Sequence, residues 1–287
     1  MRITGKTRLA GIMGWPIGHS RSPALHNFWI ESNGLDAVYV PLAVRPEQLD
    51  TALRALPVLG FRGCNLTIPH KQIALSVVDR VEPLARRIGA VNTVIVAPDG
   101  TLEGRNTDVY GFGESLRESA PDWDAGTGPA VVLGAGGAAR AVVAALIEAG
   151  VAEVRLTNRS LANAERLAAE LAMPGATIAA YAWPRRNAIL EGASVLVNTT
   201  SLGMTGQPEL AIDLAALPRN ALVADVVYVP LETGLLAAAR RRGNRAVDGL
   251  GMLLHQGRPG FEAWFEAPAR VTRELRAAVL TTLETAR

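Results

Sequence analysis

A run of apolar residues that breaks into closely spaced glycines constrains the fold of this chain more than any other feature. The run Val131-Val132-Leu133 is followed by Gly134, Gly136 and Gly137 and then by an alanine-rich stretch. This order is typical of a strand, a tight turn and the first turn of a helix, where bare backbone N–H groups can bind a dinucleotide pyrophosphate. Gly134 allows the turn, Gly136 the close approach of the phosphates, and Ala139 the packing of helix on strand.

The segment after the next strand indicates which dinucleotide binds. The strand predicted at residues 153–157 ends about 20 residues after the glycines, where an NAD enzyme usually carries a carboxylate for the ribose 2′-hydroxyl. This chain has Asn158, Arg159 and Ser160 there. A carboxylate would repel a 2′-phosphate, whereas an arginine can bind it through charge-assisted hydrogen bonds. The sequence therefore favours NADP. The alternative is that Arg159 is a solvated side chain beside Ser160, which would cap the following helix.

The length and charge of the chain limit its class. Its 287 residues exceed the usual size of one compact core, so two domains are expected. The 29 basic and 27 acidic residues are spread along the chain. The densest basic cluster, Arg240 to Arg242 with Arg245, ends a helical pattern, where the helix dipole and solvent favour positive charge. No nucleic-acid partner is expected.

Cysteine usage and hydropathy predict the compartment. Cys64 is the only cysteine, so an intrachain disulfide or a thiolate metal cluster is excluded, and a reduced, buried thiol is expected. No metal site is predicted. No apolar run approaches the ~20 residues needed to cross a membrane, and the N-terminus lacks an apolar signal core. The sequence thus predicts a cytoplasmic protein without a membrane partner.

The order of predicted elements indicates an α/β architecture. The first hundred residues alternate strands and helices, with a helix start at Ser22-Pro23 capped by the Ser22 hydroxyl. Strands near residues 153–157, 194–198 and 221–226 alternate with helical stretches, the rhythm of a doubly wound parallel sheet. From Leu250 the pattern is helical but interrupted at Gly257 to Gly260. The final stretch, residues 270–285, is predicted to be an amphipathic helix that returns to the first domain.

Two polar segments of the first hundred residues allow more than one interpretation. The loop that contains Ser20 and Ser22 can provide helix-capping and turn hydroxyls, or it can bind a polyol or a carboxylate. Lys71 ends a polar segment after a predicted strand, and most such lysines are solvated surface groups. Physical chemistry alone leaves both alternatives open for the serine loop.

In order and spacing, these segments together resemble the shikimate dehydrogenase family along nearly the whole chain. The matching blocks are Pro16-Ile17 with His19 to Pro23 and His26-Asn27, Asn65 to Lys71, Gly89 to Thr93, Asn106 to Asp108, Gly134 to Ala139, Asn158-Arg159, Asn198 to Thr200, Gly203-Met204, Asp225 to Tyr228, and Gly249 to Met252 with Gln256. So many ordered blocks are far more specific than a single glycine motif.

The resemblance implies a fold and an activity. The fold is α/β with two domains. Residues 1–107 plus 249–287 would form a substrate-binding and catalytic domain completed by C-terminal helices. Residues 108–248 would form a doubly wound Rossmann-type NADP-binding domain. The activity implied is the reversible NADPH-dependent reduction of 3-dehydroshikimate to shikimate in chorismate and aromatic amino-acid biosynthesis. The partner is a small molecule, and the expected assembly is a monomer or a homodimer.

The resemblance also assigns residues. It implies a catalytic Lys71 with Asp108 as its carboxylate partner. The positions that match the family's substrate contacts are Ser20, Ser22, Thr67, Asn92, Tyr228 and Gln256. The positions that match its cofactor contacts are Gly134, Ala135, Gly136, Gly137, Ala138, Asn158, Arg159, Ser160, Gly249 and Met252. The residue types suit the chemistry, because a ketone that receives hydride needs a proton donor and a carboxylated polyol needs hydroxyl and amide partners.

The sequence departs from the family pattern at one position. NADP-preferring members often carry a second basic residue a few positions after the first arginine, and here Asn163 stands at that position. The preference for NADP over NAD is therefore expected to be smaller than in a site with two basic residues. Arg140, early in the predicted nucleotide helix, is either a further phosphate contact or a solvated side chain.

Three other functions compete with this assignment. A quinate/shikimate dehydrogenase would share the fold and catalytic pair but prefer NAD or accept quinate; the two loop serines and Arg159 argue against it. A paralogue that acts on an aminated shikimate analogue is the second. A nucleotide-sensing protein without turnover is the third, and the presence of both Lys71 and Asp108 argues against it.

Overall fold

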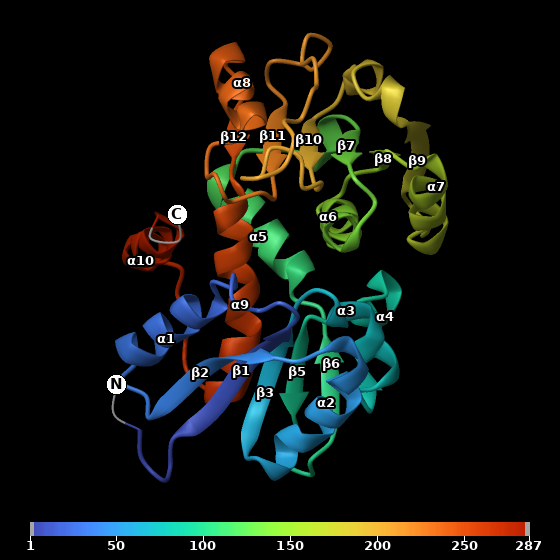
Figure 1. Cartoon of the computed structure of the whole chain (residues 1–287). Coiled ribbons are helices and arrows are strands. Elements are labelled where there is room, and N and C mark those ends of the chain that lie inside the picture. Colours follow the sequence, from blue (N-terminus) through green and yellow to red (C-terminus); the bar gives the residue numbers. More distant parts are fainter. Residues whose placement is uncertain (1–2, 285–287) are drawn as a thin grey trace. The chain divides into compact units, whose positions relative to one another are not determined.

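The computed structural model describes residues 3–284, which divide into two compact units (Figure 1). Of the described residues, the first unit comprises 3–107 and 256–284, and the second comprises 108–255. The boundary between residues 255 and 256 lies inside helix α9 (Gly249–Phe265), which runs unbroken through Gln256. The sequence prediction places this boundary at residue 249, the first residue of the helix. Among the described residues, no helix has both the length and the apolar character needed to span a bilayer.

The first unit is built on a mixed six-stranded sheet. Its strands, in sheet order, are β2 (Ala37–Ala43), β1 (Arg8–Gly14), β3 (Phe61–Leu66), β5 (Thr93–Val96), β6 (Leu102–Arg105) and β4 (Arg80–Val81). Strands β2, β1 and β3 are parallel, whereas β5 runs antiparallel to both β3 and β6. The segment Pro98 to Gly100 forms the turn that joins β5 to β6.

Helices cover this sheet and bury its apolar residues. They are α1 (Ser22–Ser32), α2 (Leu49–Val58), α3 (His70–Ile73), α4 (Pro83–Ile88) and the C-terminal part of α9, while α10 (Arg273–Glu284) lies outside α1. Leu49, Leu53 and Leu56 of α2 pack against Cys64 and Leu66 of β3. Cys64 is free and buried, as expected, and burial raises the pKa of its thiol. The predicted C-terminal helix is confirmed as α10, which packs on α1.

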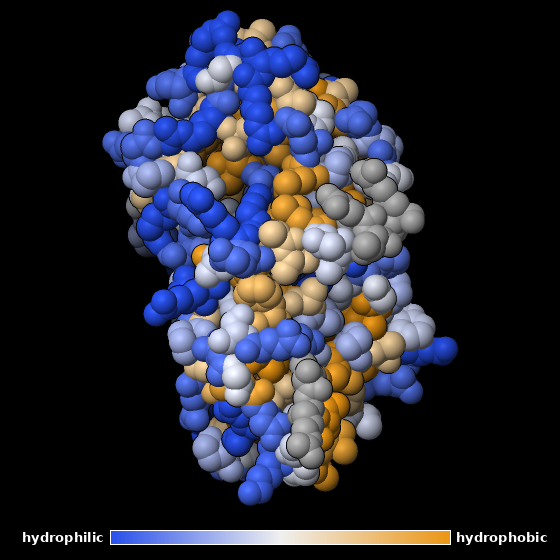
Figure 2. Space-filling view, turned by 90° about the vertical axis from the view of Figure 1, so that its left-hand side faces the viewer, coloured by the Kyte–Doolittle hydropathy of each residue, from blue (hydrophilic) through white to orange (hydrophobic). Residues whose placement is uncertain are grey.

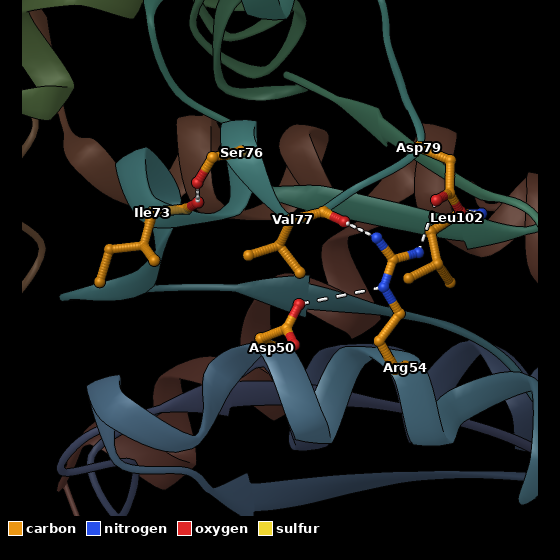
Figure 3. Close-up of polar contacts among 7 residues, drawn as sticks. All are labelled: Asp50, Arg54, Ile73, Ser76, Val77, Asp79 and Leu102. Carbon is orange, nitrogen blue, oxygen red and sulfur yellow. Dashed lines mark hydrogen bonds and ion pairs between the residues drawn. The ribbon is translucent and has the colours of Figure 1, made fainter.

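An arginine on α2 fixes the segment that follows α3. Arg54 donates hydrogen bonds to the carbonyl of Val77 and the carboxylate of Asp79, and the Asp79 carboxylate also accepts from the backbone N–H of Leu102 at 2.8 Å (Figure 3). The Leu102 N–H and the Arg54 guanidinium lower the pKa of Asp79. These contacts connect α2, β6 and the segment after α3, so the short helix that carries Lys71 is held from its C-terminal side.

The second unit is a doubly wound, Rossmann-type sheet. Its strands, all parallel, are in sheet order β12 (Ala246–Val247), β11 (Leu222–Asp225), β10 (Val195–Asn198), β7 (Ala130–Leu133), β8 (Glu153–Asn158) and β9 (Thr177–Ala182). The chain winds outward from β7 to β9 and then outward from β10 to β12. The strand order therefore reverses between β7 and β10, which is where ligands bind in folds of this class.

In the second unit, α5 precedes the first strand of the sheet, and the other helices alternate with or follow its strands. The helices are α5 (Asp108–Ser119), α6 (Gly137–Glu148), α7 (Leu161–Glu170), α8 (Gly234–Arg242) and the first residues of α9. Val131 and Leu133 of β7 lie in one apolar cluster with Leu235 and Leu236 of α8. The residue between them, Val132, points to the opposite face because strand side chains alternate. Both faces of the sheet are thus buried, as the continuous apolar run predicts.

Two sequence predictions about helices are wrong. Helix α9 is not interrupted at Gly257 to Gly260, and Pro259 lies inside it. The glycines serve close packing instead, because a Cβ on Gly257 would lie 2.8 Å from Leu25 Cδ2. Ser22 is not the cap of α1: the N-cap is Arg21, and no side chain caps the helix. Instead, the Ser20 hydroxyl accepts a hydrogen bond from the backbone N–H of Ser22 at 3.3 Å.

The basic cluster lies on the last turn of α8, where the sequence predicts that the helix dipole favours it. Arg240, Arg241 and Arg242 form this turn, and Gly243 ends the helix in a left-handed conformation with φ 88°. Hydrophilic residues dominate the surface at this end of the unit (Figure 2, top). Arg242 donates to the carbonyl of Leu217 at 3.0 Å. The cluster is therefore accounted for by local contacts, the helix dipole and solvent.

Candidate nucleotide site and strand-end polar clusters

The glycine turn after β7 has the geometry that the sequence predicts. Gly134 adopts φ 111°, and a Cβ there would lie 2.6 Å from Thr199 Oγ1 in the loop after β10. The Thr199 hydroxyl donates to the carbonyl of Leu133 at 2.7 Å. The turn and the loop after β10 therefore meet at the point where the strand order reverses, and only glycine fits at position 134.

The first turn of α6 is open to a ligand. Gly136 is its N-cap, and no side chain there accepts the first backbone N–H groups. A Cβ on Gly136 or Gly137 would have no heavy atom within 4 Å, whereas Ala139 is fully buried. Ala135 and Ala138 are half-buried on either side of the glycines. Free N–H groups, the positive end of a twelve-residue helix and open space fit a dinucleotide pyrophosphate.

The two residues that follow β8 differ in role: Ser160 caps helix α7, and Arg159 is an exposed cation. The Ser160 hydroxyl caps α7 by accepting the backbone N–H of Asn163 at 3.4 Å, and Asn158 Nδ2 donates to the carbonyl of Ser160 at 3.0 Å. The predicted cap is therefore confirmed. Arg159 is exposed and, within residues 3–284, forms no ion pair. Its guanidinium is available to an anion.

Arg140 is neither a freely solvated side chain nor a group left free for phosphate, the two alternatives that the sequence allows. Its guanidinium pairs with the carboxylate of Glu170 on α7, and its side chain is only 11% exposed. Arg166 of α7 also approaches Glu170, at 3.8 Å. Glu170 therefore lies between two arginines, and its ion pair with Arg140 joins α6 to α7.

A buried carboxylate at the end of β11 holds two loops. Asp225 is 2% exposed and accepts hydrogen bonds from Asn198 Nδ2 of β10 at 3.0 Å, the backbone N–H of Val227 at 3.0 Å and the Thr233 hydroxyl at 2.8 Å. Asn198 also accepts the backbone N–H of Thr200 at 3.1 Å. The loops after β10 and β11 therefore share this one carboxylate. Burial raises the pKa of Asp225 to about 6, against the opposing effect of its three donors.

The raised pKa of Asp225 leads to a stability prediction for Asp225→Asn. A carboxyl whose pKa is higher in the folded protein stabilises it most at low pH and loses that contribution as the pH rises through about 6. The asparagine is neutral at every pH and can keep the contacts, because the Thr233 hydroxyl can accept from its amide. From about pH 4 to pH 7, wild type should lose about 2 kcal/mol of unfolding free energy relative to the variant.

Urea unfolding of both proteins across that pH range measures the difference. Asp213→Asn is the matched control, because Asp213 lies at an exposed turn of the same unit. Parallel stability profiles for wild type and Asp225→Asn would contradict the raised pKa.

A second polar cluster lies at the ends of β3 and β5 in the first unit. The Asn65 amide donates to the Thr93 hydroxyl at 3.0 Å, and the Tyr39 hydroxyl donates to Asn65 Oδ1 at 2.6 Å. Asn92 Oδ1 accepts the backbone N–H of Thr107 at 2.8 Å, and Asn92 Nδ2 lies 3.5 Å from Gln256 Oε1. We call Tyr39, Asn65, Asn92, Thr93, Thr107 and Gln256 the Asn92 cluster. All are buried, so their partners fix their orientations.

The loop after β1 leads into α1, whose first residue, Ser22, is buried. Burial raises the pKa of the Tyr39 phenol. Tyr39 in turn stacks on His26, with ring centroids 4.1 Å apart. Burial lowers the pKa of His26 to about 3, so its ring is neutral. Ser20 is half-buried in the same loop.

The loop after β3 carries Thr67 and leads into the short helix with Lys71. The backbone N–H of Thr67 donates to the carbonyl of Met13 at 3.0 Å, and the carbonyl of Lys71 accepts the backbone N–H of Val91 at 2.8 Å. His70 is buried, and its Nε2 lies 2.9 Å from the carbonyl of Val44. Lys71 and Asn92 are therefore brought together, because Val91 precedes Asn92 directly. Lys71 itself is half-buried.

The remaining predicted residues belong to the second unit. Asp108, 8% exposed, begins α5 directly after Thr107, and Tyr228 is half-buried in the loop held by Asp225. A Cβ on Gly249 would lie 2.3 Å from the carbonyl oxygen of Val226, so this glycine packs against the end of β11. Met252 is half-buried one turn further along α9.

Several polar residues of these clusters have no separate role that the sequence predicts. They are Tyr39, Asn65, Thr93 and Thr107 in the first unit and Asn198, Asp225 and Thr233 in the second. One signal was present, because Asn198 and Asp225 are the last residues of apolar strands. Within the described residues, no group of three or more His, Cys, Asp or Glu side chains could hold a metal ion.

Comparison with known proteins supports one family over the whole chain. Residues 12–94 match the family described as shikimate dehydrogenase substrate binding domain, and residues 124–225 match shikimate/quinate 5-dehydrogenase. The chain is 60% identical to the NADP(+) shikimate dehydrogenase of Paramagnetospirillum magneticum, over 97% of this chain and 100% of that protein.

Solved structures agree with this match. Shikimate 5-dehydrogenase from Thermus thermophilus, in complex with NADP(H) and shikimate, is similar with a TM-score of 0.83 and 36% identity, over 98% of this chain and 100% of that one. Quinate dehydrogenase from Corynebacterium glutamicum, in complex with NAD, is similar with a TM-score of 0.89 and 34% identity, over 96% of this chain and 99% of that one. Since both units and nearly every residue take part in these matches, the chain belongs to the shikimate dehydrogenase family.

Proposed function

We propose that this protein is an NADP-dependent oxidoreductase that reversibly reduces 3-dehydroshikimate to shikimate, a step of chorismate and aromatic amino-acid biosynthesis. The observation that carries the proposal is the 60% identity, over the full length of the relative, to a protein named shikimate dehydrogenase (NADP(+)). The open N-terminus of α6 and the exposed Arg159 support a dinucleotide with a 2′-phosphate.

The catalytic roles proposed for Lys71 and Asp108 follow from the chemistry of ketone reduction. NADPH, when bound, supplies the hydride to the carbonyl carbon. The carbonyl electron pair then moves to oxygen, which takes a proton as the C–OH group forms. Lys71 is the proposed donor of that proton, and Asp108 is proposed to orient the ammonium group. The backbone contact between Lys71 and Val91 supports a fixed position for the lysine.

The substrate is proposed to bind through hydroxyl and amide groups. Ser20 and Ser22 are assigned to the carboxylate, and Thr67, Asn92, Tyr228 and Gln256 to the ring hydroxyls. The buried Asn92 cluster supports this assignment, because its internal hydrogen bonds orient Asn92 and Gln256 before a ligand arrives. Hydroxyls bind a carboxylate without placing a second buried charge beside it.

The cofactor is proposed to bind along the carboxyl edge of the second sheet. The turn from Gly134 to Ala138 is assigned to the pyrophosphate and Asn158 to Ser160 to the adenosine ribose. Gly249 and Met252 are assigned to the nicotinamide end. The Ser160 hydroxyl is engaged as a helix cap and its carbonyl accepts from Asn158, so its backbone N–H is the group that would contact the ribose.

Quinate oxidation is the alternative activity, and similarity to a quinate dehydrogenase bound to NAD is the observation that favours it. Steady-state rates for shikimate and quinate, each with NADP and NAD, decide between the two. The highest kcat/KM is expected for shikimate with NADP. A higher kcat/KM for quinate with NAD would overturn the proposal.

Ser20→Ala and Ser22→Ala are expected to raise KM for shikimate by about fivefold each, the effect of one hydrogen bond of ~1 kcal/mol. Their contact would lie away from the reacting carbon, so kcat should change little. Ser32→Ala, at the far end of α1, is the control. Lower melting temperatures with an unchanged KM would mean that the loop acts in folding only.

The cellular setting forms part of the proposal. We place the protein in the cytoplasm as a monomer or homodimer that binds small molecules and neither nucleic acid nor membrane. A single, buried and unpaired cysteine supports a reducing compartment.

A further inference from the structure

The cofactor site of the proposed enzyme needs more positive charge than Arg159 supplies. A phosphate monoester carries a charge of about −1.5 to −2 at pH 7. Position 163, one turn into α7, is a neutral asparagine whose backbone N–H is engaged by the Ser160 cap. The inference that follows rests on the proposed NADP site and identifies a further residue that determines its specificity.

The second unit places another arginine at the same sheet edge as Arg159. Strands β8 and β9 are neighbours in the sheet (Figure 1). They run parallel, and their register pairs Asn158 with Ala182. Neighbouring strands lie about 4.8 Å apart. Arg159 is the residue after the end of β8, and the turn Trp183–Arg185 follows the end of β9 directly. This turn also contacts β8. Arg159 and Arg185 therefore leave adjacent strands at one edge.

Arg185 is exposed and held in place without a counterion. Its guanidinium carbon lies 5.5 Å from the centroid of the Tyr181 ring. Tyr181 is itself fixed, because its carbonyl accepts the Thr157 hydroxyl of β8 at 2.9 Å. Within residues 3–284, Arg185 forms no ion pair. Stacking on an aromatic face orients a guanidinium and leaves its N–H groups free to bind an anion.

The other arginines near this edge already have partners. Arg186 donates to the carbonyls of Ala211 at 2.8 Å and Trp183 at 3.2 Å. Arg140 and Arg166 both approach the carboxylate of Glu170. Among the described arginines of α6, α7 and the turn after β9, Arg185 is the one left for a ligand. We propose that Arg185 binds the 2′-phosphate of NADP together with Arg159 and so supplies the second positive charge that the neutral Asn163 cannot.

Binding of two small probes tests this role directly. The probes are 2′,5′-ADP, which carries the 2′-phosphate, and 5′-AMP, which lacks it. Arg185→Ala should raise the Kd of 2′,5′-ADP about tenfold, as for the loss of one charge-assisted hydrogen bond, and leave the Kd of 5′-AMP unchanged. Arg185→Lys should recover part of the loss, because it keeps the charge but not the planar fork. Arg166→Ala is the matched control and should change neither Kd.

Steady-state kinetics separate this inference from the proposed function. In Arg185→Ala, KM for NADP should rise about tenfold with kcat unchanged and KM for NAD unaffected. An unchanged Kd for 2′,5′-ADP, or an equal loss for both probes, would overturn the role of Arg185 while shikimate turnover still stood. Failure of wild type to oxidise shikimate with either dinucleotide would instead overturn the proposed function.

Discussion

Lys71→Ala is expected to lower kcat by about 10²–10⁴-fold, the usual contribution of a general acid or base. KM for shikimate should change little, because the proposed substrate contacts of the carboxylate and ring hydroxyls come from other residues. The α3 backbone should keep its place, since its contact to Val91 is made by the Lys71 carbonyl and not by the side chain. The measurement is kcat and KM for shikimate oxidation with saturating NADP.

The neighbouring Gln72 gives the control for this variant. Gln72 lies on the same short helix and is exposed, so Gln72→Ala should retain wild-type turnover. Asp108→Asn should also reduce kcat and alter the pH–rate profile, because it removes the carboxylate proposed to orient the lysine. A near-normal kcat in Lys71→Ala would remove the lysine from the mechanism.

Arg159→Ala is expected to raise KM for NADP by about tenfold to a hundredfold and to leave KM for NAD nearly unchanged. The reason is that only NADP carries the 2′-phosphate that this exposed guanidinium would bind. Ser160 and its cap of α7 are not touched, so the helix start should remain. Initial rates at varied NADP and NAD concentrations measure the two KM values.

Arg166→Ala again serves as the control, because Arg166 pairs with Glu170 on the same helix. Equal losses with NADP and NAD would indicate that Arg159 acts in folding and not in cofactor choice. In that case Arg159→Ala should also melt at a lower temperature than Arg166→Ala.

The nucleotide half of the fold could be predicted from sequence because its signals are local. A buried strand, a glycine that needs a positive φ and a short-side-chain helix follow one another directly, and the structure has each in place. The continuity of α9 could not be predicted, because Gly257, Pro259 and Gly260 disfavour a helix locally. Tertiary packing decides there: a Cβ on Gly260 would lie 2.9 Å from the Trp264 ring.

The polar clusters were only partly predictable for the same reason. Each residue type was visible, but its partner depends on which strands pair. Asn65 reaches Thr93 because β3 and β5 are antiparallel and place these two residues opposite each other. Asn198 reaches Asp225 because β10 and β11 pair in register at their last residues. Strand pairing is a property of the whole sheet, and no local pattern encodes it.

The shared carboxylate of Asp225 makes the loops after β10 and β11 a single module for protein engineering. A grafted loop after β10 that lacks Asn198 would leave the buried carboxylate short of a donor, and a new loop after β11 without Thr233 would do the same. Such an uncompensated group costs about 1–3 kcal/mol. Loop exchange between relatives should therefore transfer both segments together with the strand-end residues that join them.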